Sequence, residues 1–302
     1  MCILVVGAGA IGGYFGGRML AAGSDVTFLV RPRRAAQLAE HGLVVRSAGG
    51  DLAIAAPPTV QAGAIAGPFD AVVLSCKAYD LDSAMDAFAP AVGPGTRILP
   101  LLNGIAHIDT LVARFGDAAV LGGQCQISTT LEPDGTIRQF GTMQALSLGA
   151  RSGPAEPVTQ ALASALAPCG GQLSEAVVQD MWDKWVFITT LAASTCLMRG
   201  TIGDMVAADA QEVPLGIAAE CAAIADHCGH AARPALLERL RAMVATAGSP
   251  LSASMLRDLV RGGPVEVEHV VGDMLRRGEA GHAPLLRVAY LHLKTYEAAR
   301  GV

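Results

Sequence analysis

Short apolar runs alternate with helical stretches through the first half of the chain. The runs cover residues 2–6, 26–30, 71–75, 97–101 and 120–123, and a helical pattern follows the first run to about Ala22. Such alternation predicts βαβ units, and with them an α/β fold built on a parallel, doubly wound sheet.

Two hairpins are expected to interrupt this alternation. Residues 43–55 read as a strand, a Gly49-Gly50-Asp51 turn and a second strand, which predicts a hairpin inserted before the fourth main strand. Another hairpin is predicted over residues 129–148, around Pro133-Asp134-Gly135.

From about Glu175 the β pattern gives way to long helical patterns rich in Ala and Leu. They are broken at Gly200, Gly229, Gly248-Ser249-Pro250 and Gly262-Gly263-Pro264. We therefore expect an α/β domain over residues 1–173 and an all-α domain over residues 174–302, with the boundary near Leu173. The length of 302 residues agrees, since roughly 150 residues make one domain.

Composition and charge exclude several classes of protein. With 52% hydrophobic and 16% charged residues, the chain can bury a sizeable core and is not disordered. A net charge of -5 and the lack of a basic run argue against a nucleic-acid or membrane partner. The start of the chain has no basic segment before its apolar run, and no later stretch reaches the roughly 20 apolar residues of a membrane span, so we expect a cytoplasmic protein.

The cysteines indicate neither a metal site nor a disulfide framework. They are odd in number, seven, and form no CxxC pair: Cys2, Cys76, Cys125, Cys169, Cys196, Cys221 and Cys228. Reduced, mostly buried thiols fit this pattern.

The first apolar run leads into Gly7-Ala8-Gly9-Ala10-Ile11-Gly12, which opens a helix. A GxGxxG sequence between a strand and a helix predicts a Rossmann domain that binds a dinucleotide. Gly7 permits the tight turn, Gly9 lets a pyrophosphate approach the backbone, and Gly12 lets helix and strand pack closely. The free N–H groups of the helix then face the phosphates. The alternative is a glycine-rich turn without a ligand.

The second strand ends in Phe28-Leu29-Val30-Arg31-Pro32-Arg33-Arg34, where NAD-binding proteins usually carry an acid. Arg31, with Arg33 or Arg34 nearby, is suited to pair with a 2′-phosphate, so NADPH is the cofactor that we expect. Asp25 lies at the wrong end of the strand to replace the missing acid. The alternative interpretation is a solvated basic turn.

Two polar residues follow later strands, at the edge where parallel sheets collect ligands. Lys77 follows the run 71–75 and is a candidate contact for a cofactor or substrate anion; Asn103 follows 97–101 and is a candidate amide near the nicotinamide. Either residue is equally suited to a solvated loop. His107 lies at the start of the next predicted helix. We interpret it first as a residue of the helix cap region and second as a substrate contact.

Lys184 lies in the helical segment Met181-Trp182-Asp183-Lys184-Trp185-Val186-Phe187-Ile188, among large apolar side chains. A partly desolvated ammonium group has a lowered pKa and can donate a proton near neutral pH, as a general acid must. The alternative is an i,i+4 ion pair with Asp180 in which the lysine reaches outward.

Taken in order, these motifs resemble the ketopantoate reductase (2-dehydropantoate 2-reductase) family almost from end to end. The markers are the glycine motif, Arg31, Cys76-Lys77-Ala78, Leu102-Asn103-Gly104, Trp182-Asp183-Lys184, Ser254-Met255 and Glu266. The resemblance implies hydride transfer from NADPH to the carbonyl carbon of a 2-oxo acid, which yields a 2-hydroxy acid.

The resemblance also implies roles for individual residues. Lys184 is similar to the family's proton donor and Glu266 to its acidic partner. Asn103 and Lys77 would position nicotinamide and substrate, and Ser254 would bind the polar end of the substrate. Structural alternatives remain: Glu266 or Glu268 in a first helical turn, and Ser254 or Ser252 as a helix cap.

Three positions depart from the family pattern. Ile188 and Ala192, one and two helical turns after Lys184, replace asparagines that commonly face the substrate, and Leu251 replaces another polar residue. A site without these amides loses hydrogen bonds to a hydroxylated substrate. We therefore expect ketopantoate or a less polar 2-oxo acid as the small-molecule partner, with a homodimer as the candidate assembly.

Two other functions remain open from the sequence. One is a different dehydrogenase with a Rossmann and a helical domain, acting on an amino-acid derivative or a sugar phosphate. The other is an NADP(H)-binding sensor that has lost turnover.

Overall fold

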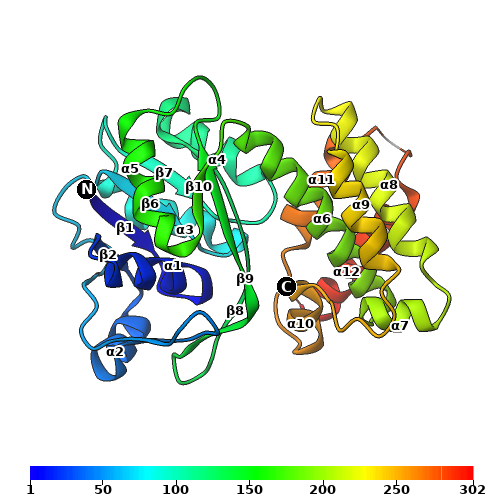
Figure 1. Cartoon of the computed structure of the whole chain (residues 1–302), viewed down its shortest axis with the longest axis horizontal. Helices are drawn as coiled ribbons and strands as arrows, with labels where there is room; N and C mark the ends of the chain where they lie inside the picture. Colours follow the sequence, from blue (N-terminus) through cyan, green and yellow to red (C-terminus); the bar gives the residue numbers. More distant parts are fainter. Residues whose placement is uncertain (280, 302) are drawn as a thin grey trace. The chain divides into compact units, whose positions relative to one another are not determined.

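The computed structural model describes residues 1–279 and 281–301. The chain folds into two compact units: Met1–Leu102 with His107–Asp180, and Asn103–Ala106 with the residues from Met181 onward. The units thus divide between Asp180 and Met181, inside helix α6 (Val177–Met198), whereas the sequence suggested Leu173. Figure 1 shows the first unit in blue to green and the α-helices of the second mainly in green to red.

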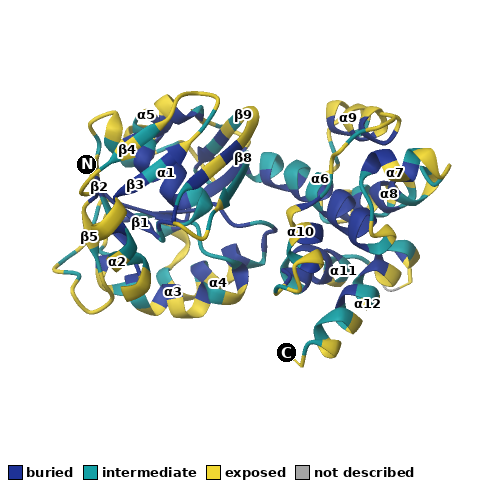
Figure 2. Ribbon diagram, turned by 90° about the horizontal axis from the view of Figure 1, so that it is seen from below, coloured by how far each residue is buried: buried dark blue, intermediate teal, exposed yellow. Residues whose placement is uncertain are grey.

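The first unit is built on a parallel sheet, as predicted. Its strands run in the order β5-β2-β1-β6-β7, which is the Rossmann order once the short edge strand β5 is counted third. Strand β1 is almost fully buried because it has a strand on each side and helices on both faces (Figure 2). The bounds are β1 Cys2–Val6, β2 Asp25–Leu29, β5 Thr59–Val60, β6 Ala71–Leu74 and β7 Arg97–Pro100.

A second sheet in the same unit holds both predicted hairpins. Its order is β10-β9-β3-β4, and β8 pairs with β9. Strands β3 and β4 are antiparallel around the Gly49-Gly50-Asp51 turn, and β8 and β9 are antiparallel around Pro133-Asp134-Gly135. The bounds are β3 Leu43–Arg46, β4 Leu52–Ile54, β8 Gly122–Leu131, β9 Ile137–Gly149 and β10 Gly171–Leu173.

One predicted strand of the parallel sheet was wrong. Of residues 120–123, only Val120 bridges Ile98 in parallel, and Gly122 already begins β8. Gly123 crosses β7 so closely that a Cβ atom there would lie 2.3 Å from Leu99 Cδ1. The chain therefore leaves the parallel sheet at this point and pairs with β9.

Helices complete both units. In the first unit they are α1 Ala10–Ala21, α2 Pro32–His41, α3 Leu81–Phe88, α4 Ala106–Phe115 and α5 Pro157–Leu166, with short 3-10 turns such as Ala78–Asp80. The second unit contains helices and turns and, among its described residues, no strand: α6, α7 Ile202–Ala207, α8 Glu212–His227, α9 Pro234–Val244, α10 Ser254–Val260, a π-helical turn Glu268–Gly272, α11 Asp273–Arg277 and α12 Pro284–Ala299. The expected fold, a Rossmann sheet followed by an all-α region, is confirmed. No helix within the described residues is long and apolar enough to cross a membrane.

Candidate active site

The glycine loop between β1 and α1 has the geometry of a phosphate-binding turn. Gly7 has φ +92°, which favours glycine, and its N–H donates to the Leu29 carbonyl at 2.9 Å. A Cβ atom on Gly12 would lie 2.3 Å from the Gly7 carbonyl oxygen, whereas one on Gly9 would meet nothing within 4 Å. Helix α1 has no side-chain cap and no acid in its first turn. Its free N–H groups and the open face of Gly9 therefore fit a pyrophosphate.

Adjacent strands bring Arg31 and Lys77 to the same edge as this loop. Val6 at the end of β1 is in register with Leu29 of β2 and with Leu74 of β6. Arg31 follows β2 as the N-cap residue of α2, and Lys77 follows β6 and precedes a 3-10 turn. The sheet thus groups these residues as the sequence suggested.

The Arg31 side chain is 70% exposed and pairs with a residue that the sequence did not single out. Its Nη2 donates to Asp80 Oδ1 at 2.7 Å and lies 3.4 Å from Ser83 Oγ. The hydrogen bond that Arg31 donates to Asp80 raises the pKa of the Arg31 guanidinium. Asp80 lies three residues after Lys77 at the same sheet edge, and this position is the sequence signal that could have identified it.

Arg34 faces inward, unlike its exposed neighbour Arg33. Its Nε donates to the Ala8 carbonyl at 2.9 Å, and its Nη1 donates to the carbonyl of Gly135 at the β8–β9 turn at 3.2 Å. Burial lowers the pKa of this guanidinium. Arg34 therefore fastens the glycine loop to the hairpin, whereas Arg31 and Arg33 are exposed.

Lys184 is partly buried on α6, in the second unit. Its neighbours along the helix are fixed: the Trp182 and Trp185 rings lie 5.0 Å apart, and Trp182 stacks on His230 at 5.0 Å. Asp183 ion-pairs with Arg233 at 3.2 Å. The lysine thus lies on a rigid, largely apolar helix. Asp180, the alternative ion-pair partner from the sequence, accepts a hydrogen bond from Ser174 Oγ at 2.6 Å.

The structure separates the two candidate glutamates. Glu266 is only 9% exposed and lies just before the π-helical turn. Glu268 lies inside that turn and binds surface groups: Tyr290 Oη at 2.8 Å, Arg276 Nη1 at 2.9 Å and Lys294 Nζ at 3.0 Å. Glu268 therefore has a structural role, and Glu266 is the buried carboxylate of the two. π-Helical turns often mark functional sites.

Three predicted site segments pack together within the second unit. Trp185 Nε1 donates to the Val270 carbonyl at 2.9 Å, and Thr189 Oγ1 donates to the same oxygen at 3.2 Å, so α6 is bound to the π-helical turn. Gly104 has φ +80°, and a Cβ atom there would lie 2.5 Å from the His269 carbonyl oxygen. The backbone beside Asn103, the helix of Lys184 and the segment after Glu266 are therefore held as one body.

Ser254 opens α10 as an exposed residue, and no side chain caps this helix. The N–H of the preceding Ala253 donates to Thr195 Oγ1 of α6 at 3.4 Å, so α10 begins against the helix of Lys184. The capping role that we considered for Ser254 and Ser252 is not observed. His107 lies inside α4, fully buried.

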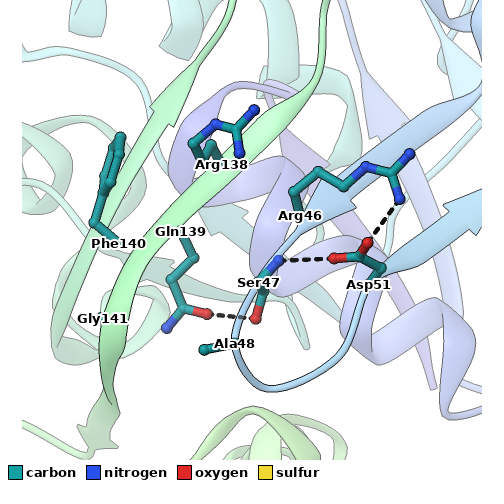
Figure 3. A pocket seen from close by; sticks show the side chains of 8 residues that line it. All are labelled: Arg46, Ser47, Ala48, Asp51, Arg138, Gln139, Phe140 and Gly141. Carbon is teal, nitrogen blue, oxygen red and sulfur yellow. Dashed lines mark hydrogen bonds and ion pairs between the residues drawn. The ribbon is translucent and has the colours of Figure 1, made fainter.

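A shallow surface hollow of about 550 Å³ lies elsewhere in the first unit, beside the β3–β4 hairpin and β9 (Figure 3). Its polar groups bind one another: Arg46 pairs with Asp51 at 2.7 Å, and Ser47 Oγ donates to Gln139 at 2.6 Å. The hollow contains none of the site residues that the sequence predicted.

A glycine loop on a Rossmann sheet, joined to an all-α unit with a lysine and a buried glutamate, defines a nicotinamide-dependent oxidoreductase. Residues 3–153 match the family model of ketopantoate reductase PanE/ApbA, and residues 176–297 match the model of its C-terminal part. The chain therefore belongs to the ketopantoate reductase family, as its ordered motifs predicted, and is an oxidoreductase acting on CH–OH and C=O groups.

Relatives of known sequence or structure agree with this assignment over nearly the whole chain. The uncharacterized oxidoreductase YkpB of Bacillus subtilis is 33% identical over 99% of this chain and 100% of its own. A 2-dehydropantoate 2-reductase of Mesorhizobium japonicum is 25% identical over 94% of this chain and 93% of its own. The crystal structure of 2-dehydropantoate 2-reductase from Methylococcus capsulatus covers 100% of this chain and 98% of its own, at 26% identity and a TM-score of 0.88.

Proposed function

We propose that this protein reduces a 2-oxo acid, ketopantoate or a less polar analogue, to the 2-hydroxy acid with NADPH. The observation that carries the proposal is the packing in the second unit of the Asn103–Gly104 backbone, the Lys184 helix and the Glu266 segment. The membership of the ketopantoate reductase family supports it, and so do relatives named 2-dehydropantoate 2-reductase.

The first unit would hold NADPH through residues whose geometry fits it. The loop Gly7–Gly12 would bind the pyrophosphate, Arg31 the 2′-phosphate and Lys77 the nicotinamide end, where Asn103 of the second unit would also contact the nicotinamide. When bound, NADPH would supply the hydride that is added to the carbonyl carbon of the substrate.

Residues of the second unit would donate the proton and orient the substrate. Lys184 Nζ donates its proton to the carbonyl oxygen as that oxygen becomes an alkoxide, and solvent then reprotonates the amine. The Glu266 carboxylate holds the ammonium group in place, and the Asn103 amide and Ser254 hydroxyl bind polar groups of the substrate.

The preference for a less polar substrate rests on the α6 face that carries Lys184. Ile188 and Ala192 follow it at helical spacing on that face, and Leu251 precedes α10. None of the three offers a hydrogen bond to a hydroxyl group. We expect higher kcat/KM for 3-methyl-2-oxobutanoate, which lacks the hydroxymethyl group of ketopantoate, than for ketopantoate itself. Ile188→Asn should shift the ratio toward ketopantoate.

NADPH oxidation by the wild type and by Lys184→Ala, measured with a panel of 2-oxo acids, tests the mechanism. Loss of the general acid should lower kcat by about 10²–10⁴-fold and leave the Kd of NADPH nearly unchanged. Turnover that is insensitive to this change would exclude Lys184 as the donor. Tight NADPH binding without turnover on any carbonyl compound would indicate a sensor instead.

A further inference from the structure

An ion pair connects the two strands that flank β1, at the edge where the cofactor ribose is expected. Arg31 follows β2 and Asp80 follows β6, and β1 with its glycine loop lies between those strands. The Nη2–Oδ1 distance is 2.7 Å, and the Asp80 side chain is 33% exposed. The group proposed to bind the 2′-phosphate therefore already has an anionic partner.

This partner affects the two nicotinamide cofactors differently. A 2′-phosphate carries roughly two negative charges, so binding it to Arg31 means displacing or crowding the Asp80 carboxylate. NADH has only a ribose hydroxyl at that position and leaves the ion pair intact. The carboxylate that commonly holds the ribose 2′-hydroxyl ends the second strand; here Arg31 follows that strand, and Asp80, which follows β6, reaches it.

We propose that Asp80 is a specificity-determining residue that narrows the preference for NADPH over NADH, because its carboxylate competes with the 2′-phosphate for the Arg31 guanidinium. The inference rests on the proposed cofactor site. Arg31 and Asp80 would then set the cofactor preference together, and removal of the Asp80 charge would increase the preference for NADPH over NADH.

The opposite effect is expected if Asp80 only orients Arg31 for the phosphate. Removal of the carboxylate would then leave the arginine disordered and weaken NADPH binding. The two effects have opposite signs, so one substitution separates them.

The test is titration of the full-length protein with NADPH and with NADH. Asp80→Asn keeps the shape of the side chain, Asp80→Ser is a second variant, and Asp82→Asn removes an exposed charge two residues away as the matched control. We expect the Asp80 variants to raise the Kd ratio of NADH to NADPH by about three- to tenfold and the control to leave it unchanged. The gain should shrink when salt is raised to about 0.5 M, because the pair is solvent-exposed.

An unchanged or lower ratio in both Asp80 variants, with both cofactors still bound, would overturn the role of Asp80 and leave the cofactor site standing. If the wild type binds neither cofactor, or if Arg31→Ala weakens NADPH and NADH equally, the cofactor site itself fails and the Asp80 inference fails with it.

Discussion

Gly104 holds a backbone conformation that few other residues adopt, directly beside the proposed site residue Asn103. An alanine there would be strained at φ +80° and would also place its Cβ 2.5 Å from the His269 carbonyl oxygen. We expect Gly104→Ala to lower the free energy of unfolding by about 2–4 kcal/mol and to lower kcat, because the Asn103 amide shifts.

Gly229 offers a matched control for this prediction. It lies in the same unit at the same φ of +80°, with nothing within 4 Å of its Cβ position. Gly229→Ala should therefore cost only about 1 kcal/mol and leave kcat unchanged. Urea unfolding and steady-state kinetics of both variants check this, and equal costs for the two would refute the role of the His269 carbonyl.

Arg34 supports the glycine loop through hydrogen bonds to two backbone carbonyl groups. Arg34→Met keeps the length of the stem and removes the hydrogen bonds to Ala8 and Gly135. We expect a loss of about 1–3 kcal/mol in stability and a clearly weaker Kd for NADPH, because the glycine loop loses its support. Arg33→Met, at the exposed neighbour, removes the same charge but neither of these hydrogen bonds, so it should leave the stability unchanged. Thermal unfolding and NADPH titration provide both measurements.

At the residue scale, the sequence predicted those features that depend on neighbouring residues of the chain. The roles of Gly7 and Gly12 follow from one short segment, so the motif was sufficient. The partner of Arg31 lies 49 residues away in sequence, and the only sequence signal for it is the position of Asp80 three residues after Lys77. Likewise, Glu266 and Glu268 are equivalent by pattern, and only tertiary burial separates them.

At the scale of elements, periodicity and turn chemistry predicted the helices and both hairpins. The error at residues 120–123 has a physical reason: an apolar run shows that a strand forms but not which strand it pairs with. The short strands β5 and β10 were missed because two or three residues carry no periodicity. The π-helical turn has no sequence signal of this kind, although it connects Glu266 to the Lys184 helix.

That π-helical turn is fastened to α11 and α12 by Glu268. Burial raises the pKa of this carboxyl group. Hydrogen bonds from Tyr290, Lys294 and Arg276 together lower it by more, so that the pKa is about 2 instead of the ordinary 4.5. A depressed folded-state pKa stabilises the fold above about pH 4.5, and this contribution is lost as the pH falls toward 2.

Glu268→Gln should therefore destabilise the protein most near pH 7, by about 1 kcal/mol, since the group is partly exposed and screened. At pH 3 the difference between variant and wild type should be clearly smaller. Unfolding by urea at both pH values measures it, and a difference that grows on acidification would contradict the assignment of the ion cluster.

At the scale of the whole molecule, the chain passes between its two units three times. Segment Asn103–Ala106 belongs to the second unit while its flanks belong to the first, and α6 begins in the first unit and continues into the second. A continuous helix and an embedded segment should make the two units unfold cooperatively. A ligand of the first unit should then stabilise the second as well.

NADPH at about one hundred times its Kd should raise the free energy of unfolding by about 2.7 kcal/mol. We expect this gain for both units, because helix α6 runs from the first unit into the second without a break. Hydrogen exchange in mild denaturant, followed on peptides from β1 and β6 and on peptides from α8 and α12, measures the two units separately. Arg31→Ala at the same NADPH concentration should remove most of the gain from both sets. Protection confined to the β1 and β6 peptides would show that the units open independently, and the cofactor would then leave the stability of the Lys184 helix unchanged.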